Sequence, residues 1–323
     1  MALKQVEIRV AGKNTLVPAA EICGQTVIVK GGRIKTASIL DEAVTPGEHV
    51  KDPEAFVAAL RQSGLKADVL TFFQRPPDVT PKFKHHFDWE NLAVVDTTNF
   101  EAWWEKLPQE ARKNTRRSAK RGVVVKSAVY DDALVQGIHK LCNESPVRQG
   151  KPFWHYGKDF ETVKREHGTF LDRSEFVVAY FENEVIGFIK MVYVDRLAVI
   201  LHIIAFNSHY DKRPLNALLT KAVEICSQKG VGYFVYGNYV YGNKKDSSLV
   251  EFKRRNGFEQ LNFPRYYIPL TLKGKIYVAL RLYRGVVGLL PGPVLNLLLK
   301  VRDKFYARKE KAEAPKPEAA KEE

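Results

Sequence analysis

The sequence predicts an α+β fold, a mixed β-sheet flanked by helices, and the pattern of the C-terminal half carries this prediction. Three β-rich apolar runs follow one another on two short turns, at 176–181, 185–194 and 197–206. Such runs are typical of an antiparallel meander. From Leu215 to Cys226, apolar residues recur at three- and four-residue steps behind Pro214, which indicates an amphipathic helix. We expect a β-to-helix junction at 207–215.

The rest of this half alternates between strand and helix. Gly230 ends the amphipathic helix, and Tyr233–Tyr236 forms a short strand-like run. A last helix is expected over Asp246–Asn256 and ends at Gly257, and a final strand runs from 258 to 267. The order is therefore three strands, helix, strand, helix, strand.

Residues 1–100 have the pattern of a small α/β unit. Apolar runs at Thr26–Val29 and Ile34–Leu40 are bounded by turn signals and predict strands. A helical pattern starts at Pro53, because proline is favoured at the first helical position. Val69–Phe73 has the pattern of a buried strand.

A strongly basic helix is expected before the C-terminal half. An amphipathic segment at 100–107 leads into 112–121, which is mostly Lys and Arg and has no acidic residue. Gly122 ends the helix and Val123–Val125 begins a strand.

Composition favours a folded protein with an anionic partner. Hydrophobic residues make up 45% and charged residues 27% of the 323 residues, which excludes wholesale disorder, a collagen-like repeat and a disulfide-stapled miniprotein. This length is enough for two ordinary domains or one large one. The 51 Lys and Arg against 37 Asp and Glu give a net charge of +14, which favours nucleic acid, a membrane surface or a phosphorylated small molecule as partner.

The cysteines indicate a reducing compartment, and the apolar runs predict neither a secretory signal nor a membrane span. Cys23, Cys142 and Cys226 are far apart and form no CxxC pair, so we expect neither a disulfide framework nor a metal site. The N-terminus has no apolar run behind its basic residues, and we expect a cytoplasmic protein. The apolar stretch at 285–299 is too short and interrupted to span a membrane.

The order of elements resembles the GNAT acyltransferase fold, and Phe252-Lys253-Arg254-Arg255-Asn256-Gly257-Phe258 looks like the FxxxxGF close of that superfamily. The basic helix followed by Gly-Val-Val-Val, at 112–125, is similar to Fem-type aminoacyltransferases that build peptidoglycan cross-bridges. The resemblance covers 30–270, and it is strongest at 110–260. It implies a GNAT-like (acyl-CoA N-acyltransferase) fold with two tandem units, the first degenerate. Among Fem-like proteins, the chain most resembles FemAB-like N-acyltransferases of uncertain substrate.

These patterns divide the chain into four parts. We expect an N-terminal GNAT-like α/β unit, a GNAT-like catalytic domain, an apolar and basic segment and a disordered tail, at 1–100, 101–272, 273–309 and 310–323. The composition of 280–309 is that of an interfacial anchor, so we expect peripheral contact with an anionic inner membrane face. The alternative is a C-terminal helix packed on the core.

The junction after the meander is the expected donor site. A helix N-terminus offers unpaired N–H groups and a positive dipole end, and basic side chains add charge, so an anion is expected there. The expected donor-binding residues are Ile204, His209, Lys212, Arg213 and Asn216. The resemblance implies acyl-CoA or aminoacyl-tRNA as donor, but coenzyme A-dependent relatives carry two spaced glycines here and residues 207–216 contain none. The alternative is a solvated basic turn.

Between helices expected at 131–143 and 159–167, the loop 146–158 concentrates hydrogen-bonding and stacking side chains. Such a loop is typical of substrate recognition, and the alternative is aromatic packing on the sheet. The expected substrate-binding residues are Arg148, Gln149, Trp154, Tyr156 and Lys158. His155 is the loop's imidazole and a candidate for proton transfer. His202, in the third meander strand, is expected to be a core histidine.

Tyrosines follow the strand after the amphipathic helix. The resemblance implies a tyrosine here that protonates the leaving thiolate, which makes Tyr239 or Tyr241 the candidate general acid. The alternative is a tyrosine-rich strand edge. Glu144 and Asp246 are candidate bases for the attacking amine, and nothing in the pattern distinguishes them.

Together these features predict an N-acyltransferase that moves an acyl or aminoacyl group from a thioester or aminoacyl-tRNA to an amine by direct attack. A backbone N–H near 203–206 is expected to stabilise the oxyanion. The sequence shows no nucleophile elbow or ligand-spaced cluster, so neither a covalent intermediate nor a metal is expected. One alternative is a non-catalytic GNAT-like scaffold that binds RNA, through phosphate contacts of the basic helix at 112–126, or a membrane. Another is an enzyme that uses a long-chain acyl carrier.

Overall fold

The computed structural model describes residues 3–10, 13–148, 150–242 and 244–285. Its strands are β1 (Lys4–Val10), β2 (Lys13–Ile22), β3 (Gln25–Lys30), β4 (Thr36–Ile39), β5 (Val69–Phe73), β6 (Phe87–Asp96), β7 (Val124–Ala128), β8 (Val147–Arg148), β9 (Lys151–Pro152), β10 (Ser174–Phe181), β11 (Glu184–Val194), β12 (Leu197–Ala205), β13 (Tyr233–Val235) and β14 (Glu259–Pro269). Its helices are α1 (Pro53–Gln62), α2 (Phe100–Lys106), α3 (Gln109–Lys120), α4 (Asp132–Cys142), α5 (Phe160–His167), α6 (Pro214–Gln228), α7 (Ser248–Arg255) and α8 (Leu272–Ala279). Short 3-10 turns are η1 (Leu171–Arg173), η2 (Asn207–Lys212) and η3 (Leu282–Arg284).

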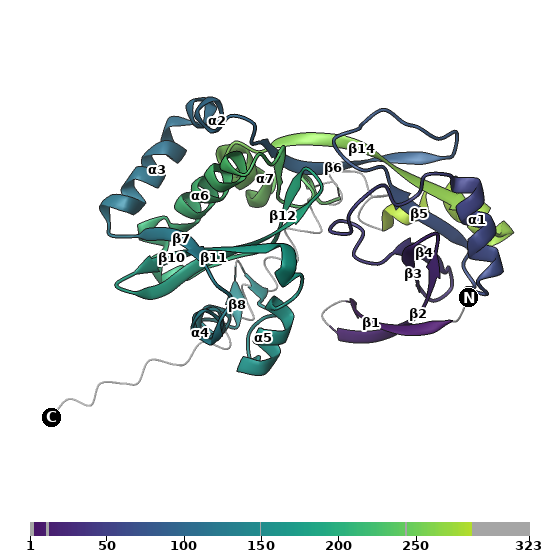
Figure 1. Cartoon of the computed structure of the whole chain (residues 1–323), viewed down its shortest axis with the longest axis horizontal. Helices are drawn as coiled ribbons and strands as arrows, with labels where there is room; N and C mark the ends of the chain where they lie inside the picture. The colour runs from purple at the N-terminus through teal and green to yellow at the C-terminus, as the bar shows by residue number, and fades with distance from the viewer. Residues whose placement is uncertain (1–2, 11–12, 149, 243, 286–323) are drawn as a thin grey trace, which may run out of the picture.

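One mixed sheet of 12 strands runs through both halves, in the order β1-β2-β3-β4-β5-β14-β6-β13-β12-β11-β10-β7. Strand β14 follows α7 in sequence, yet it pairs antiparallel with both β5 and β6. In Figure 1, β6 and β14 cross from one half to the other. The predicted α+β class with a mixed sheet is confirmed, and so is the antiparallel meander of β10, β11 and β12.

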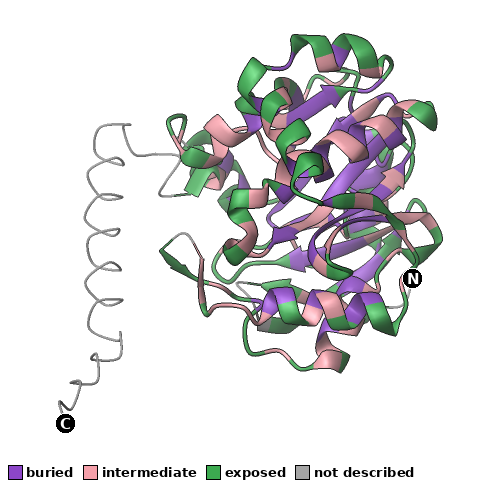
Figure 2. Ribbon diagram, turned by 90° about the vertical axis from the view of Figure 1, so that its left-hand side faces the viewer, coloured by how far each residue is buried: buried purple, intermediate pink, exposed green. Residues whose placement is uncertain are grey.

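Alternation along the meander places helices on both faces of the sheet. On β10, Val177 and Ala179 belong to the apolar cluster that includes α6, whereas Phe176 and Val178 belong to the cluster beneath α4 and α5. Successive side chains of a strand point to opposite faces of the sheet, so this run of apolar residues packs against helices on both faces. Figure 2 shows buried residues along these central strands and exposed residues on the outer helices.

Acidic and hydroxyl side chains begin most of the helices. For example, the carboxylate of Asp131 accepts the N–H of Leu134 at 2.8 Å and starts α4, and Asp159 accepts the N–H of Thr162 at 2.7 Å and starts α5. Such caps satisfy N–H groups that have no intrahelical acceptor. All the predicted helices are present, with small shifts at their ends: the one that starts at Pro53 and those at 100–107, 112–121, 131–143, 159–167, 215–226 and 246–256.

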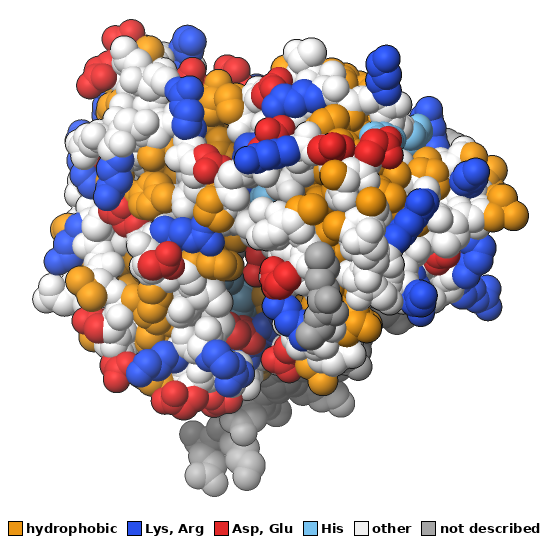
Figure 3. Space-filling view, turned by 45° about the vertical axis from the view of Figure 1, so that its right-hand side comes forward, with side chains coloured by type: hydrophobic (Ala, Val, Ile, Leu, Met, Phe, Trp, Pro, Cys, Tyr) orange, Lys and Arg blue, Asp and Glu red, His pale blue; other side chains and the backbone are white. Residues whose placement is uncertain are grey.

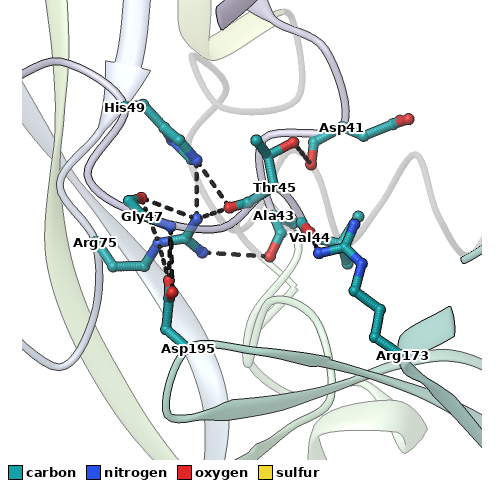
Figure 4. A network of polar contacts seen from close by, with 9 residues as sticks. All are labelled: Asp41, Ala43, Val44, Thr45, Gly47, His49, Arg75, Arg173 and Asp195. Carbon is teal, nitrogen blue, oxygen red and sulfur yellow. Dashed lines mark hydrogen bonds and ion pairs between the residues drawn. The ribbon is translucent and has the colours of Figure 1, made fainter. Parts of the chain in front are cut away.

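Side-chain contacts join the two halves beside the β11–β12 hairpin (Figure 4). The guanidinium of Arg75 lies 3.5 Å from the carboxylate of Asp195, in the hairpin turn, and the N–H of Gly47 donates to the same carboxylate at 3.0 Å. Nearby, Arg173 Nη1 donates to the carbonyl of Val44 at 2.8 Å. The loop between β4 and α1 is therefore fixed to the C-terminal meander.

Parts of the sequence prediction lie outside the described residues. These are the tail at 310–323 and all of the apolar segment after residue 285. No helix in the described part of the chain is long and apolar enough to cross a membrane. The division at residues 100 and 272 stays a prediction, although β14 links the sheet of one expected unit to that of the other.

Candidate functional site

The candidate site begins where two parallel strands diverge. Strand β12 pairs with β13 only over Leu197–Val199. A β-bulge follows at Leu201, where the register against β11 shifts by a residue. Within the described residues, β12 then continues to Ala205 with no ladder on its β13 side. This divergence leaves an opening in the sheet.

Backbone donors of β12 point into the opening. The N–H of Phe206 donates to the carbonyl of Ile186 on β11, and antiparallel ladders alternate the direction of successive residues. The N–H groups of Ile203 and Ala205 therefore point away from β11. The carbonyl of Ala205 points the same way and accepts from Arg148 Nη1 at 2.9 Å. Oriented N–H groups of this kind are suited to stabilising an oxyanion.

A pocket of about 870 Å³ lies at the opening. Its walls come from α3, the loop after α4, β12, the start of α6 and α7. The lining residues include Glu110, Asn114, Arg148, Phe153, Ile203, Ile204, Ala205, Tyr210, Arg213, Pro214, Leu215, Asn216, Tyr236, Ser248, Phe252, Arg254, Arg255 and Asn256. This volume is within the range of small-molecule and cofactor sites.

The N-terminus of α6 forms one wall of the pocket. Arg213 precedes the helix with a left-handed φ of 56°, and its side chain makes no capping hydrogen bond to the helix. Pro214 has no N–H, so Leu215 and Asn216 carry N–H groups that lack an intrahelical acceptor. Asn216 Nδ2 donates to Asn256 Oδ1 at 2.9 Å and ties this end to α7. The N–H groups, the helix dipole and Arg213 together suit an anionic group.

Arg148, which forms a largely buried ion pair with Glu144, lines another part of the pocket. Arg148 Nη2 lies 2.9 Å from Glu144 Oε2 and donates to the carbonyl of Leu141 at 3.0 Å. The Glu144 carboxylate accepts the N–H groups of Asn207 and Ser208 at 2.9 and 3.0 Å. A carboxylate of the protein therefore takes up backbone donors at the start of the turn η2 after β12, and these donors are not free to bind a substrate phosphate.

A buried lysine adjoins the pocket from α7. Lys253 is fully buried, and its Nζ donates to the carbonyl of Asn238 at 2.5 Å. The Nζ also lies 4.6 Å from the ring centroid of Tyr236 and 5.0 Å from that of Tyr241. Burial lowers the pKa of Lys253 to about 8. The Lys253 ammonium is therefore charged at neutral pH and loses its proton at mildly alkaline pH.

The tyrosines differ in their access to the pocket. Tyr236 lines the pocket, and burial raises its pKa to about 12, so its hydroxyl remains protonated. Tyr239 packs against the apolar cluster around α6, and Tyr241 is half exposed. The predicted general acids Tyr239 and Tyr241 thus lie next to a tyrosine that contacts the pocket directly.

The predicted donor-binding residues divide into two groups. The pocket is lined by Ile204, Arg213 and Asn216. His209 and Lys212 instead lie against the ring of Phe181, with 6.0 Å between ring centroids for His209 and 4.5 Å from Nζ to the centroid for Lys212.

The predicted substrate loop also divides. Arg148 lines the pocket, while the lining does not include Trp154, Tyr156 or Lys158, and Gln149 lies outside the described residues. The exposed Trp154 ring lies near two cations, Arg9 and Lys158, each 4.5 Å from its centroid.

His155 lies close to two other histidines, the buried His167 and the partly buried His202. Its ring centroid is 5.7 Å from that of His167 and 5.9 Å from that of His202. Burial lowers the pKa of His155 to about 3 and that of His202 to about 2. Both imidazoles are therefore neutral at physiological pH, and His155 is not among the pocket-lining residues.

Sequence reasoning did not single out Lys253 or the α3 residues Glu110 and Asn114. One signal in the sequence is the spacing of Lys253, which lies four residues after the apolar Leu249 on α7; the structure places Leu249 in the pocket wall. Residues at this spacing share a helix face, so a lysine there faces the interior.

A meander whose last strand diverges from a parallel neighbour, with a helix N-terminus at the opening, defines the GNAT-like fold that the sequence predicts. The sequence matches no family model and no curated protein. Among solved structures, FemX matches with a TM-score of 0.59 and 12% identity, over 86% of this chain and 90% of FemX.

Two further solved structures share the fold. L-PGS from Bacillus licheniformis matches with a TM-score of 0.52 and 13% identity, over 84% of this chain and 89% of that one. A domain assigned as the C-terminal domain of a lysylphosphatidylglycerol synthetase from Agrobacterium fabrum matches with a TM-score of 0.52 and 15% identity. The match covers 82% of this chain and 88% of that domain. At these identities the likeness concerns the fold: the chain has a GNAT-like, FemAB-like acyltransferase fold.

Proposed function

We propose that the protein is an N-acyltransferase that moves an acyl or aminoacyl group directly from an activated donor to an amine. The observation that carries the proposal is the opening beyond Leu201, where the N–H groups of β12, the N-terminus of α6 and a pocket of about 870 Å³ meet. An acyl transferase needs these features together, because an oxyanion and an anionic carrier must be bound side by side.

In the proposed reaction, the amine nitrogen attacks the donor carbonyl and a C–N bond forms. The N–H groups of Ile203 and Ala205 are placed to stabilise the resulting oxyanion. When the oxyanion collapses, the carrier leaves by cleavage of a thioester C–S bond or an ester C–O bond. The proton lost by the amine nitrogen balances the one that the leaving sulfur or oxygen gains.

Tyr236 and Lys253 are the side chains that we assign to charge and proton handling. The pKa of Tyr236, raised to about 12 by burial, keeps its hydroxyl available as a donor to the leaving group. The Lys253 ammonium, 4.6 Å from the Tyr236 ring, favours negative charge that develops nearby. Tyr236 thus takes the role that the sequence predicts for Tyr239 or Tyr241.

For the donor we favour an aminoacyl-tRNA over coenzyme A. Glu144 already holds the N–H groups of Asn207 and Ser208, which limits the space for a pyrophosphate after β12. The basic helix α3 forms part of the pocket wall through Glu110 and Asn114, so a nucleic acid bound along α3 would present its 3′ end to the pocket. Basic and acidic side chains are interspersed over the face seen in Figure 3, so the proposed nucleic-acid contact rests on the basic side chains of α3 and not on that face.

An exposed apolar stripe on α8 supports a second candidate function, membrane attachment. Leu272, Ile276 and Leu280 recur at four-residue steps and are 75%, 53% and 60% exposed. Lys273 and Lys275 flank them. An apolar stripe beside basic residues is typical of an interfacial helix on anionic lipid. A lipid amine or a lipid-linked group is then a reachable acceptor.

The test is turnover with defined donors. Purified protein would be mixed with acetyl-CoA, or with radiolabelled aminoacyl-tRNA, in the presence of amine acceptors that include phosphatidylethanolamine vesicles. We expect transfer of label from aminoacyl-tRNA, and Tyr236→Phe to slow it. Thiol release from acetyl-CoA alone would keep the acyltransferase proposal and overturn the choice of donor. Vesicle or RNA binding without turnover of either donor would favour the alternative of a non-catalytic GNAT-like scaffold.

A further inference from the structure

A cluster of metal-ligating side chains lies outside the machinery assigned above. Cys142 ends α4, His155 lies in the loop before α5, and His167 ends α5. One ligand atom from each of the three lies within 4.8 Å of the others, and all three residues are buried. The sequence gaps between them match no short ligand motif, so only the fold brings these residues together.

The hydrogen bonding of His167 leaves a ligand lone pair inside the cluster. Its Nδ1 lies 3.0 Å from the carbonyl of Val163, which accepts only a proton donor, so Nδ1 carries the proton. Its Nε2 is then an unprotonated acceptor, and it is buried with no partner among the described residues. His155 Nδ1 is also buried and unpartnered within the described part of the chain. Buried polar atoms normally have a partner, so two orphans in one cluster indicate an occupant.

A histidine held by a carbonyl through one ring nitrogen is the arrangement that metal sites use. The second hydrogen bond fixes the tautomer and directs the other nitrogen at the metal. Cysteine sulfur with imidazole nitrogen is the ligand chemistry of Zn²⁺, whereas Mg²⁺ and Ca²⁺ prefer oxygen. A further imidazole, that of His202, lies beside the cluster, with its ring centroid 4.4 Å from that of His167 and 5.9 Å from that of His155.

The positive charge of Lys190 beside the cluster is already engaged. Its Nζ donates to the carbonyls of His167 and Thr169, at the C-terminal end of α5, where the helix dipole favours a cation. The thiolate of Cys142, formed when the metal displaces its proton, lowers the repulsion between Lys190 and a bound dication.

We propose that Cys142, His155 and His167 bind one Zn²⁺, with His202 as the fourth ligand. The ion would join the C-terminal ends of α4 and α5 to the loop between these helices. This loop carries Arg148 and Phe153, which line the pocket, so the metal would hold a pocket wall in place without taking part in the chemistry.

The test uses the full-length protein with a tag that binds no metal. After dialysis against Zn²⁺ and then buffer, we expect one equivalent of zinc by elemental analysis. Substitution with Co²⁺ should give the thiolate-to-metal charge-transfer band of a tetrahedral cysteine site. Cys142→Ser and His167→Gln should each weaken zinc binding by about 100-fold or more and remove the band, because each deletes a ligand.

Matched controls separate ligand loss from unfolding. Cys226→Ser alters a buried cysteine of the apolar cluster around α6, and His209→Gln alters a histidine outside the proposed zinc site. Both variants should still bind one equivalent of zinc. Circular dichroism should show that metal-free wild type and the ligand variants share a fold. Zinc should raise the melting temperature of wild type but not of the variants. Absence of stoichiometric zinc from folded wild type, or equal zinc in Cys142→Ser, would overturn the proposal.

Discussion

Glu144 and Arg148 form an ion pair of 2.9 Å that holds the end of β12 from both sides. The carboxylate binds the N–H groups just after the strand, and the guanidinium binds the carbonyl of Ala205. Arg148, which the sequence predicts to bind substrate, also shapes the opening, because its Nη1 and Nη2 donate to carbonyls of the protein's own backbone and to Glu144.

Glu144→Gln should destabilise the protein strongly. The substitution leaves the Arg148 charge largely buried without its partner, and losses of this kind cost about 3 kcal/mol or more. The measurement is the free energy of unfolding in urea. The control is Glu184→Gln, which removes the exposed pair between Glu184 and Lys140 and should cost under about 1 kcal/mol. Equal losses for the two variants would contradict a structural role for the buried pair.

Lys253→Met should separate activity from folding. Methionine has a similar length, and replacing a buried charge by an apolar group costs little stability, although the carbonyl of Asn238 loses its donor. If the ammonium stabilises charge in the transition state, its removal should lower kcat by about 100- to 1000-fold. The measurement is single-turnover transfer with the donor that the wild type uses.

The control for this variant is Lys229→Met. The Lys229 side chain is 53% exposed and directly follows α6, at the end of that helix away from the pocket. Its removal should leave transfer close to the wild-type rate. An equal loss of transfer in both variants would show that the effect does not depend on the position of the Lys253 ammonium.

The pH dependence of activity and stability should follow Lys253. Because burial lowers its pKa from 10.5 to about 8, the folded protein loses this proton near pH 8 and the unfolded chain loses it near pH 10.5. Transfer should therefore fall as pH rises through about 8. Between these pH values the unfolded state binds more protons, so the contribution of Lys253 to the free energy of unfolding rises with pH.

The check compares wild type with Lys253→Met across this pH range. The rise in unfolding free energy specific to wild type should disappear in the variant, and so should the alkaline fall in transfer. An alkaline limb that persists unchanged in Lys253→Met would assign it to another group.

Arg213→Gly should weaken donor binding without weakening the fold. Arg213 has a left-handed φ of 56°, which glycine adopts without strain, so stability should stay the same or rise by up to about 1 kcal/mol. Loss of the guanidinium at the N-terminus of α6 should raise KM for the donor about tenfold. Arg213→Ala is the control, because it removes the charge and keeps the backbone strain. A KM unchanged in both variants would contradict an anion site at this helix end.

The sequence predicts the elements of the fold better than it predicts the site. Apolar periodicity is local, so the meander and the amphipathic helix of 215–226 are recognisable from neighbouring residues alone. The pocket instead joins α3, β12, α6 and α7, and only tertiary packing brings their side chains together. The same applies to Cys142, His155 and His167, whose spacing carries no local signal.

Some strands also lack a clear signal. The pattern does not predict β1, β2 or β6, because β6 mixes Asp, Glu and Asn with its apolar residues and β2 contains Pro18. Pairing with β14 and β13 stabilises β6, and no property of its own sequence reveals those partners.

The apolar stripe of α8 should control attachment to anionic membranes. Helix α8 is fixed to the sheet by Thr271 Oγ1, which donates to Asp68 Oδ1 at 2.8 Å, and Gly274 packs so closely on the Asp68 carbonyl that a Cβ there would lie 1.9 Å from its oxygen. This docking turns Leu272 and Ile276 outward.

Leu272→Ser combined with Ile276→Ser should therefore reduce binding to phosphatidylglycerol vesicles by about tenfold or more, because each buried apolar side chain contributes about 1.5 kcal/mol or more to insertion. The measurement is vesicle cosedimentation at low and high salt. Leu16→Ser, which alters an exposed leucine on β2, is the control and should bind as wild type does. Equal binding by the double variant and wild type would show that α8 does not contact the membrane, and a loss with salt alone would assign the contact to basic side chains.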